Sequence, residues 1–245
     1  MRATQVSGLV LRTRKYGEAD HLLSILTLEL GKVTAIAKGA RKTTGSMRGK
    51  TQPFVFGTYM LYKGKNMYTV TQAEIKHSFG KIGEDVAKYA YANYICELMD
   101  SLLEEGEPVP GLFKILLSTI NSIEKETSPL IAPWFQLQLL QELGYGPQFQ
   151  DCVACNKKIK AGAVIFALDT GGIVCEDCTN QKPNLSGGAR GALSQLLQMR
   201  IEKVWRLKLS APIMAEIDEL AKSLINMHLV RPLKSDSFLQ CIKQD

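Results

Sequence analysis

Apolar and polar residues alternate along the first 80 residues of the chain, and glycines interrupt the alternation. A period of two is typical of strands with one buried face, and Gly17, Gly31 and Gly64 fall where turns need an unhindered backbone. The pattern predicts five strands, at residues 5–15, 21–29, 32–37, 54–62 and 67–75. Five short strands without a long helix among them favour a small barrel, and the five-stranded OB fold is the natural candidate.

Beyond residue 80 the apolar residues return about every 3.6 positions, as on one face of an amphipathic helix. The first such face contains Val86, Tyr89, Ala90, Tyr94, Leu98 and Leu102. Further helices are predicted at residues 111–124, 130–143, 188–207, 212–229 and 235–242. We therefore expect a multidomain α+β protein, with an OB-fold domain at residues 1–80 and a helical domain at residues 81–245.

Four of the six cysteines form two close pairs, with the spacing C-x2-C-x19-C-x2-C. Zinc takes four ligands in a tetrahedron, and a tight Cys-x-x-Cys turn presents two thiolates to one ion. Between the pairs, Thr170-Gly171-Gly172 predicts a turn that joins two short strands into a hairpin. We predict a zinc-finger insertion at residues 150–180 with structural Zn²⁺ bound by Cys152, Cys155, Cys175 and Cys178.

Three other interpretations of these cysteines stay open at this point. They are two redox pairs, an iron–sulfur cluster, and chance pairs of buried thiols. A redox role is weakened because thioredoxin-type pairs begin a helix after a strand, and no such helix is predicted here. The remaining cysteines, Cys96 and Cys241, lie in helical patterns and are expected to be small buried residues.

The charge of the chain is unevenly distributed, although its net value is only +6. Residues 1–80 hold 13 Lys and Arg against 4 Asp and Glu, whereas residues 81–151 hold 4 against 11. Residues 31–73 contain eight basic residues and no acidic one. Positive charge concentrated in one domain indicates a polyanionic partner, so the predicted barrel is expected to bind nucleic acid.

The candidate DNA contacts are nine basic residues of this domain: Arg12, Arg14, Lys15, Lys32, Lys38, Arg41, Lys42, Arg48 and Lys50. For each one alone, a solvated surface charge is an equally good interpretation. Residues 41–52 lack apolar periodicity and predict a mobile basic loop. Five aromatic residues on the strands are expected to divide about equally between core packing and base stacking: Phe54, Phe56, Tyr59, Tyr62 and Tyr68.

A second basic set follows the cysteines and consists of Arg200, Lys203, Arg206 and Lys208. It could extend a DNA track, meet an acidic peptide, or form a plain solvated helix face. The acidic region at residues 97–107 would repel DNA and is expected to face away from the strand path.

Recognisable catalytic motifs are missing from the sequence. His21, His77 and His228 stand in no metalloprotease spacing, and neither a G-x-S-x-G elbow nor a G-x-x-x-x-G-K-[ST] phosphate loop occurs. The sequence also has no apolar run of the roughly 18 residues needed to span a membrane and no export signal pattern. We therefore expect a cytoplasmic binding module rather than an enzyme.

A series of short, different motifs is spread in a fixed order over roughly 230 residues. Each motif is weak alone, but their agreement with the order of the predicted domains is evidence for a family resemblance. In the barrel they are Gly8-Leu9-Val10-Leu11, Tyr16-Gly17-Glu18-Ala19-Asp20, residues 28–32 and Ala37-Lys38-Gly39-Ala40-Arg41. Later landmarks are Leu143-Gly144-Tyr145, Gly171-Gly172 and Arg231-Pro232-Leu233-Lys234-Ser235. With the order of the parts, a basic barrel and then helices interrupted by a four-cysteine pair of knuckles, they resemble the RecO family of bacterial DNA repair proteins.

The resemblance implies a non-enzymatic recombination mediator in DNA repair. Such a protein binds single- and double-stranded DNA, anneals complementary strands, engages the single-strand-binding protein and, with RecR, helps to load RecA. The residues themselves leave two alternatives open. One is a zinc-stabilised enzyme that processes nucleic acid, and the other is an RNA-binding or transcription-associated zinc-ribbon protein.

Overall fold

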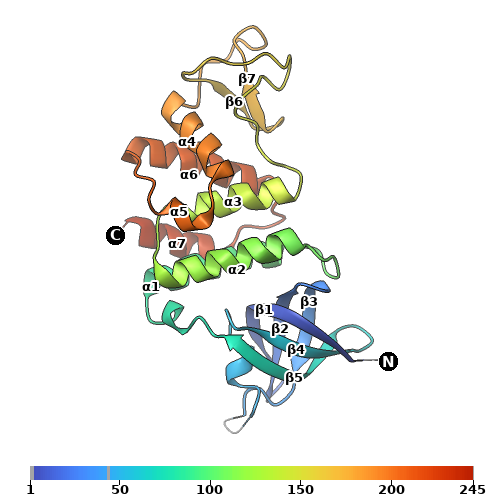
Figure 1. The fold of residues 1–245 in the computed structure, drawn as a ribbon. Coiled ribbons are helices and arrows are strands. Elements are labelled where there is room, and N and C mark those ends of the chain that lie inside the picture. The colour runs from blue at the N-terminus through green and yellow to red at the C-terminus, as the bar shows by residue number, and fades with distance from the viewer. Residues whose placement is uncertain (1–2, 43–44, 245) are drawn as a thin grey trace. The chain divides into compact units, whose positions relative to one another are not determined.

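The N-terminal strands close into a five-stranded barrel in the computed structural model, which describes residues 3–42 and 45–244 (Figure 1). The strands are β1 (Ala3–Tyr16), β2 (Asp20–Thr27), β3 (Gly31–Ala37), β4 (Phe56–Lys63) and β5 (Tyr68–His77). They neighbour one another in the order β1-β2-β3-β5-β4, with β3 and β5 parallel and the other pairs antiparallel. The five strands and the barrel predicted from the sequence are confirmed.

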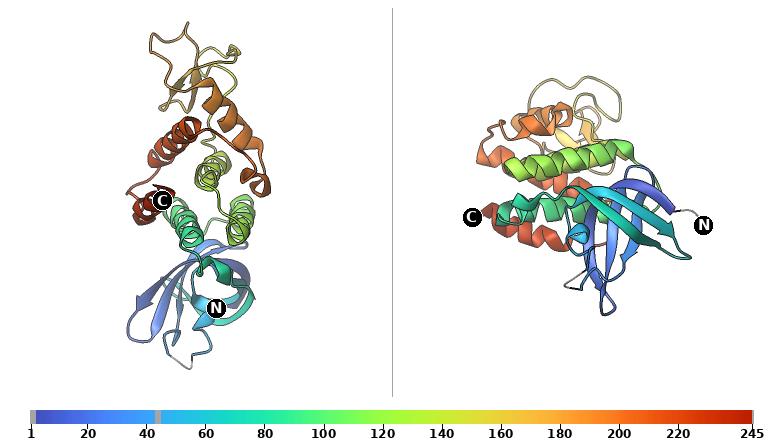
Figure 2. Two further views of the ribbon diagram at one scale, coloured as in Figure 1. Left: turned by 90° about the vertical axis from the view of Figure 1, so that its left-hand side faces the viewer. Right: turned by 60° about the horizontal axis from the view of Figure 1, so that its bottom comes forward.

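Side chains that alternate along the strands fill the barrel, whose ribbon is drawn in two further views in Figure 2. In β3 every second residue is buried, including Val33, Ala35 and Ala37, and the residues between them are half-buried. Tyr59 is completely buried in this core, and its hydroxyl donates a hydrogen bond to Val55 O at 3.2 Å. Burial raises the pKa of the Tyr59 hydroxyl, so this residue stays a neutral hydrogen-bond donor in the core.

Three helices belong to the same compact unit as the barrel, which comprises the described parts of residues 1–125 and 233–245. They are α1 (Val86–Leu102), α2 (Pro110–Lys125) and α7 (Lys234–Gln244), and two short 3₁₀ helices, η1 (Gly49–Thr51) and η2 (Gly80–Ile82), complete the unit. The Glu97 carboxylate on α1 accepts hydrogen bonds from the amides of Lys234 and Ser235 and so caps α7. This contact joins the C-terminal helix to α1.

The turn before β3 packs directly against the loop between α1 and α2. Gly31 has a φ of +67°, and a Cβ atom at this position would lie 2.0 Å from Glu107 O. The amide of Gly106 donates to Lys32 O at 2.9 Å. Only glycine allows this approach of two backbones, so the barrel and its neighbouring helices form one packed body.

The second compact unit, Glu126–Pro232, is built around α3 (Ile131–Glu142). Residues 131–137 of this helix are all buried, because α4 (Gly187–Gln198), α5 (Ile201–Val204) and α6 (Ala211–Asn226) pack against it or against one another. The single helix predicted at residues 188–207 is wrong. Trp134 Nε1 donates to Met199 O and Gln138 Nε2 donates to Leu197 O, and these α3 side chains satisfy the carbonyls left by the break between α4 and α5.

Two burial predictions fail, one in α1 and one in α7. Val86 and Tyr89 are 62% and 42% exposed, although the ring of Tyr89 contacts the ring of Phe54 edge to face. Cys96 is buried as predicted, but Cys241 is exposed. In α7 Ser235 and Leu239 are buried on one face, and the two positions from Leu239 to Cys241 turn the side chain by about 200° to the opposite face.

The compact units are defined by contacts within the fold, whereas the predicted domain bounds follow the change from strands to helices. The chain changes from strands to helices near residue 80, but the units separate after Lys125 and again at Pro232. The domains 1–80 and 81–245 stay a prediction from the sequence pattern. Among the described residues, no helix combines the length and the apolar character that a membrane span requires.

Candidate metal centre and nucleic-acid interface

The four paired cysteines meet at a small hairpin formed by β6 (Ile165–Ala167) and β7 (Gly172–Val174). Backbone pairing brings the first cysteine pair to this hairpin, since Ile173 N donates to Gln148 O at 3.1 Å and Val153 N donates to Ile173 O at 3.0 Å. The second pair follows β7 directly. Two segments that are distant in the sequence are thus held side by side, and the predicted hairpin is confirmed.

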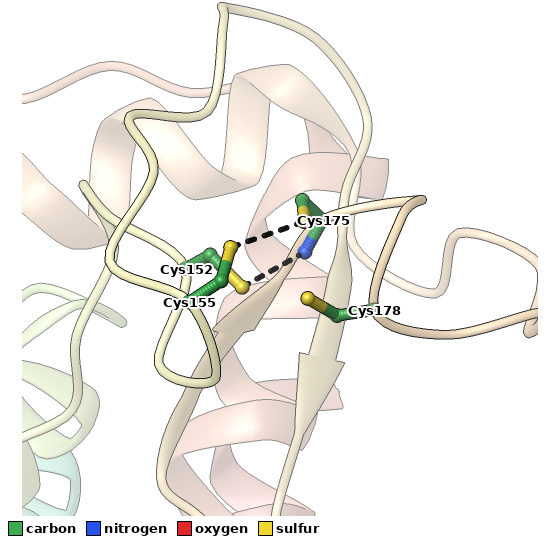
Figure 3. Close-up of side chains that lie close together, drawn as sticks. All are labelled: Cys152, Cys155, Cys175 and Cys178. Carbon is green, nitrogen blue, oxygen red and sulfur yellow. Dashed lines mark hydrogen bonds between the residues drawn. The ribbon is translucent and has the colours of Figure 1, made fainter.

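The cysteine sulfurs of this cluster converge on one point (Figure 3). Cys152, Cys155, Cys175 and Cys178 have all their sulfur atoms within 4.8 Å of one another, and Cys155 Sγ lies 3.6 Å from Cys175 Sγ. Zinc–thiolate bonds of about 2.3 Å in a tetrahedron place the sulfurs roughly 3.8 Å apart. The four residues therefore could hold one metal ion with all four positions supplied by protein.

The thiols of the cluster differ in how easily they ionise. The amide of Cys175 donates to Cys152 Sγ at 3.4 Å, and this hydrogen bond is the main cause that lowers the pKa of Cys152 to about 6. The pKa of Cys178 is raised to about 12, chiefly by its hydrogen bond with Cys175. The thiolate of Cys152 therefore forms readily. Further thiolates this close together repel one another, so their ionisation needs a cation between them. This donor set suits a soft divalent metal.

Seven of the nine predicted DNA contacts lie at one end of the barrel. We call this surface the basic barrel end, and it consists of Arg14, Lys15, Lys38, Arg41, Lys42, Arg48 and Lys50. Arg14 and Lys15 end β1 opposite the start of β2, and His21 of β2 pairs with Ala37, next to Lys38. Lys50 and Arg41 are half-buried, and the other five residues are exposed.

Hydrogen bonds join the two loops that form the basic barrel end. In the turn between β1 and β2 the carbonyl of Ala19 accepts from Arg41 N at 2.9 Å, and the carboxylate of Asp20, the first residue of β2, accepts from Gly39 N at 2.8 Å. The guanidinium of Arg41 also donates to Gly17 O at 2.9 Å. Basic residues that are up to 36 positions apart, from Arg14 to Lys50, therefore share one surface.

The loop after β3 corresponds to the segment predicted to be mobile at residues 41–52, of which residues 43 and 44 lie outside the described part. Successive turns are closed by hydrogen bonds from Lys42 N to Gly39 O, from Gly45 N to Lys42 O and from Arg48 N to Gly45 O. Thr51 is buried, and its hydroxyl donates to Met47 O at 3.0 Å. The buried threonine anchors the C-terminal end of this loop, and the mobility of the segment stays a prediction from the sequence.

The remaining two candidates, Arg12 and Lys32, face an acidic residue of α1 instead. The Asp100 carboxylate lies 3.1 Å from Arg12 Nη1 and accepts a hydrogen bond from Ser24 Oγ at 2.6 Å. Lys32 Nζ donates to the backbone carbonyl of Asp100 at 2.6 Å and lies 4.0 Å from the Asp100 carboxylate. Farther along, Glu105 accepts a hydrogen bond from Thr34. The acidic segment thus covers the β1–β3 face and neutralises both basic residues there.

Asp100→Ala is expected to lower the free energy of unfolding by about 2 kcal/mol, because it leaves two partly buried cations without their counter-charge. Urea denaturation of the purified variant measures this change. Glu104→Ala removes an equal charge from an exposed position nearby and is the matched control. Equal stability of the two variants would show that Arg12 and Lys32 do not depend on Asp100.

The aromatic candidates divide between core and surface, as the strand pattern indicates. Phe54 and Tyr59 are buried, Phe56 and Tyr68 are half-buried, and Tyr62 is exposed. The prediction missed Tyr16, which is 43% exposed at the end of β1 beside Lys15. Its position next to Gly17 in a turn is the sequence signal that could have identified it.

The second basic set does not form one helix face. Arg200 precedes α5, Lys203 lies within it, and Arg206 and Lys208 follow it, because α5 is limited to four residues. All four side chains are exposed, and the guanidinium of Arg206 stacks 5.0 Å from the ring centre of Trp205. The spacing argument for a continuous basic stripe therefore fails.

Comparison with known proteins covers nearly the whole chain. Residues 1–79 match the family model described as "Recombination protein O N terminal", and residues 83–237 match "Recombination protein O C terminal". Curated relatives from several bacteria carry the name "DNA repair protein RecO". The relative from Desulforamulus reducens is 34% identical over 242 residues, covering 98% of this chain and 94% of its own length.

Two further relatives are similar over their full lengths. The protein from Symbiobacterium thermophilum is 34% identical over 251 residues, covering 99% of each chain. The protein from Clostridium perfringens is 33% identical over 247 residues, covering 100% of each chain. The matched regions include the barrel, the helices and the four-cysteine hairpin.

Proposed function

Because the chain belongs to the RecO family of DNA repair proteins, we propose that it is a non-enzymatic recombination mediator that holds DNA at the basic barrel end. The observation that supports this proposal is a set of hydrogen bonds between the β1–β2 turn and the loop after β3. These bonds bring seven basic residues onto one surface. The β1–β3 face is a poorer candidate, since the Asp100 carboxylate already forms ion pairs with Arg12 and Lys32 there.

The proposed mechanism rests on phosphate neutralisation. Lysine and arginine side chains displace counterions from the phosphate backbone, and this gives affinity that does not depend on sequence and falls as salt rises. Two strands held on one such surface repel each other less, and their base edges remain free to pair. Annealing of complementary strands follows from this arrangement without a covalent step.

The family resemblance supports three further partners. We propose that the protein engages the single-strand-binding protein on coated DNA and, together with RecR, promotes loading of RecA. Zinc bound by the four cysteines would have a structural role, because no ligand position is left for water or substrate.

A strand-annealing assay with two complementary oligonucleotides, across a salt series, tests the proposed function. Annealing should exceed the spontaneous rate at low salt and decline as salt increases, with and without the single-strand-binding protein. Absence of both annealing and salt-sensitive binding would refute the proposal. Metal-dependent cleavage of DNA would favour the enzyme hypothesis, and preferential binding of RNA in competition would favour the zinc-ribbon hypothesis.

Tyr16 is expected to add base stacking to the basic barrel end. Tyr16→Ala should weaken binding of single-stranded DNA about tenfold, since stacking on an aromatic ring contributes roughly 1–3 kcal/mol per base, and it should leave duplex binding nearly unchanged. Fluorescence anisotropy with labelled single and double strands measures both. Tyr16→Phe keeps the ring and should bind normally, and Tyr62→Ala removes an exposed tyrosine from a different part of the barrel. Equal losses for Tyr16→Ala and Tyr62→Ala would contradict a specific role.

A further inference from the structure

Arg190 of α4 reaches the chain on both sides of the first cysteine pair. Its guanidinium donates to four backbone carbonyls, two that precede Cys152 and two that follow Cys155. The acceptors are Phe149 O at 2.9 Å, Gln150 O at 3.3 Å, Ile159 O at 3.0 Å and Lys160 O at 2.7 Å. One side chain therefore joins the two arms of the loop that carries Cys152 and Cys155.

The base of Arg190 is itself fixed in the first turn of α4. Ser186 caps this helix, since its hydroxyl accepts from Ala189 N at 3.1 Å, and its carbonyl accepts from Arg190 N at 2.9 Å. The side chains of Ala189 and Leu193 are buried in the core of the unit and anchor the same helix there. Because the backbone of Arg190 is fixed in α4, its side chain ties the cysteine loop to this helix.

The two arms of this loop also contact each other near the metal ligands. Cys152 N donates to Lys157 O at 2.9 Å, whereas farther out Ile159 N donates to Gln150 O over a longer distance of 3.4 Å. Arg190 binds at this outer, weaker pair. Guanidinium suits the position because its five N–H donors lie in one plane and can serve converging carbonyls, which a lysine ammonium cannot do with the same geometry.

We propose that Arg190 is a positioning residue of the metal centre, which fixes the separation of the two arms so that Cys152 and Cys155 are held ready for the ion. This inference rests on the proposed metal site but concerns a residue outside the ligand set. Groups that orient metal ligands without touching the ion typically change metal affinity by about 10–100-fold when they are removed. A side chain that only packs the fold would change stability without changing metal release.

The test compares zinc release from the wild-type protein, Arg190→Ala and Arg190→Lys after zinc loading. Zinc content is first measured by mass spectrometry, and release to a chromophoric chelator is then followed in time. We expect release from Arg190→Ala to be at least about tenfold faster than from the wild type, with Arg190→Lys between them. Arg200→Ala, which removes an exposed arginine of the same unit, should release zinc at the wild-type rate. If Arg190→Ala does not fold, the comparison of Arg190→Lys with Arg200→Lys decides in its place.

Release from the Arg190 variants within twofold of the Arg200 controls would overturn the proposal. A wild-type protein that binds no zinc would refute the metal site alone, and the positioning role is then judged by amide hydrogen exchange in the metal-free protein. The amides of Cys152 and Asn156, which donate to Lys157 O and Cys152 O, should exchange faster in the Arg190 variants. Unchanged exchange at both amides would overturn the positioning role independently of zinc.

Discussion

Replacing Cys152 and Cys175 together with serine is expected to abolish zinc binding and to lower the free energy of unfolding by at least about 3 kcal/mol. For a chain of this length, such a loss corresponds to a decrease in Tm of about 6–12 °C. The physical reason is that the hairpin between β6 and β7 has only three residues in each strand, so the ion would hold together two segments that backbone pairing alone holds weakly. Metal analysis and thermal unfolding of the same preparations measure both effects.

Cys241→Ser is the matched control for this prediction. Cys241 is exposed and lies outside the cysteine cluster, so its replacement should change neither zinc content nor Tm. A Cys152→Ser, Cys175→Ser protein with the Tm and metal content of this control would reject a structural metal. Iron instead of zinc in the purified protein would support the iron–sulfur alternative.

The second large effect is expected for DNA affinity when the basic barrel end loses charge. Lys38→Gln together with Lys42→Gln should reduce the slope of log K against log salt by about 1.4 for single strands, since each phosphate contact contributes roughly 0.7. We expect the affinity at low salt to fall about tenfold or more. Both lysines are exposed, so the folded structure should persist, and titrations at several salt concentrations measure the slope.

Lys63→Gln together with Lys65→Gln provides a control of equal net charge. Lys63 ends β4 and Lys65 lies in the turn that follows it, and both exposed lysines line a pocket with Lys32 of β3 and with Glu105 and Gly106. Their removal should change the salt slope by less than half as much. Equal changes of the salt slope in the two double variants would mean that DNA affinity depends on the total charge of the protein and not on the basic barrel end.

Local patterns were sufficient where local physics decides the structure. The period-two alternation predicted all five barrel strands within a few residues of their bounds, because strands with one buried face must alternate. The cysteine spacing predicted the cluster, since two Cys-x-x-Cys turns have few other geometries that use four thiols. The strand pattern predicted that about half of the five aromatic residues are buried, and two of them, Phe54 and Tyr59, are buried.

Predictions failed where a partner distant in the sequence decides the outcome. The helix expected at residues 188–207 is interrupted by extended backbone at Met199 and Arg200, where Trp134 and Gln138 of α3 bind the free carbonyls, and no signal within residues 188–207 encodes these partners. Cys241 faces outward because only one side of α7 is packed. Arg12 and Lys32 resembled the other basic residues until Asp100, 68 or more positions away, was brought to them by α1.

The sequence by itself determined the barrel strands, the positions of most helices, the four metal-ligand candidates and the basic character of the N-terminal region. These properties depend on residue type and short spacing, which are written directly in the chain. Only the tertiary structure decided which basic residues share one surface, which are neutralised by Asp100, and that Arg190 serves the cysteine loop. Those contacts join segments tens of residues apart, and charge, hydrogen bonding and close packing become specific only after the chain has folded.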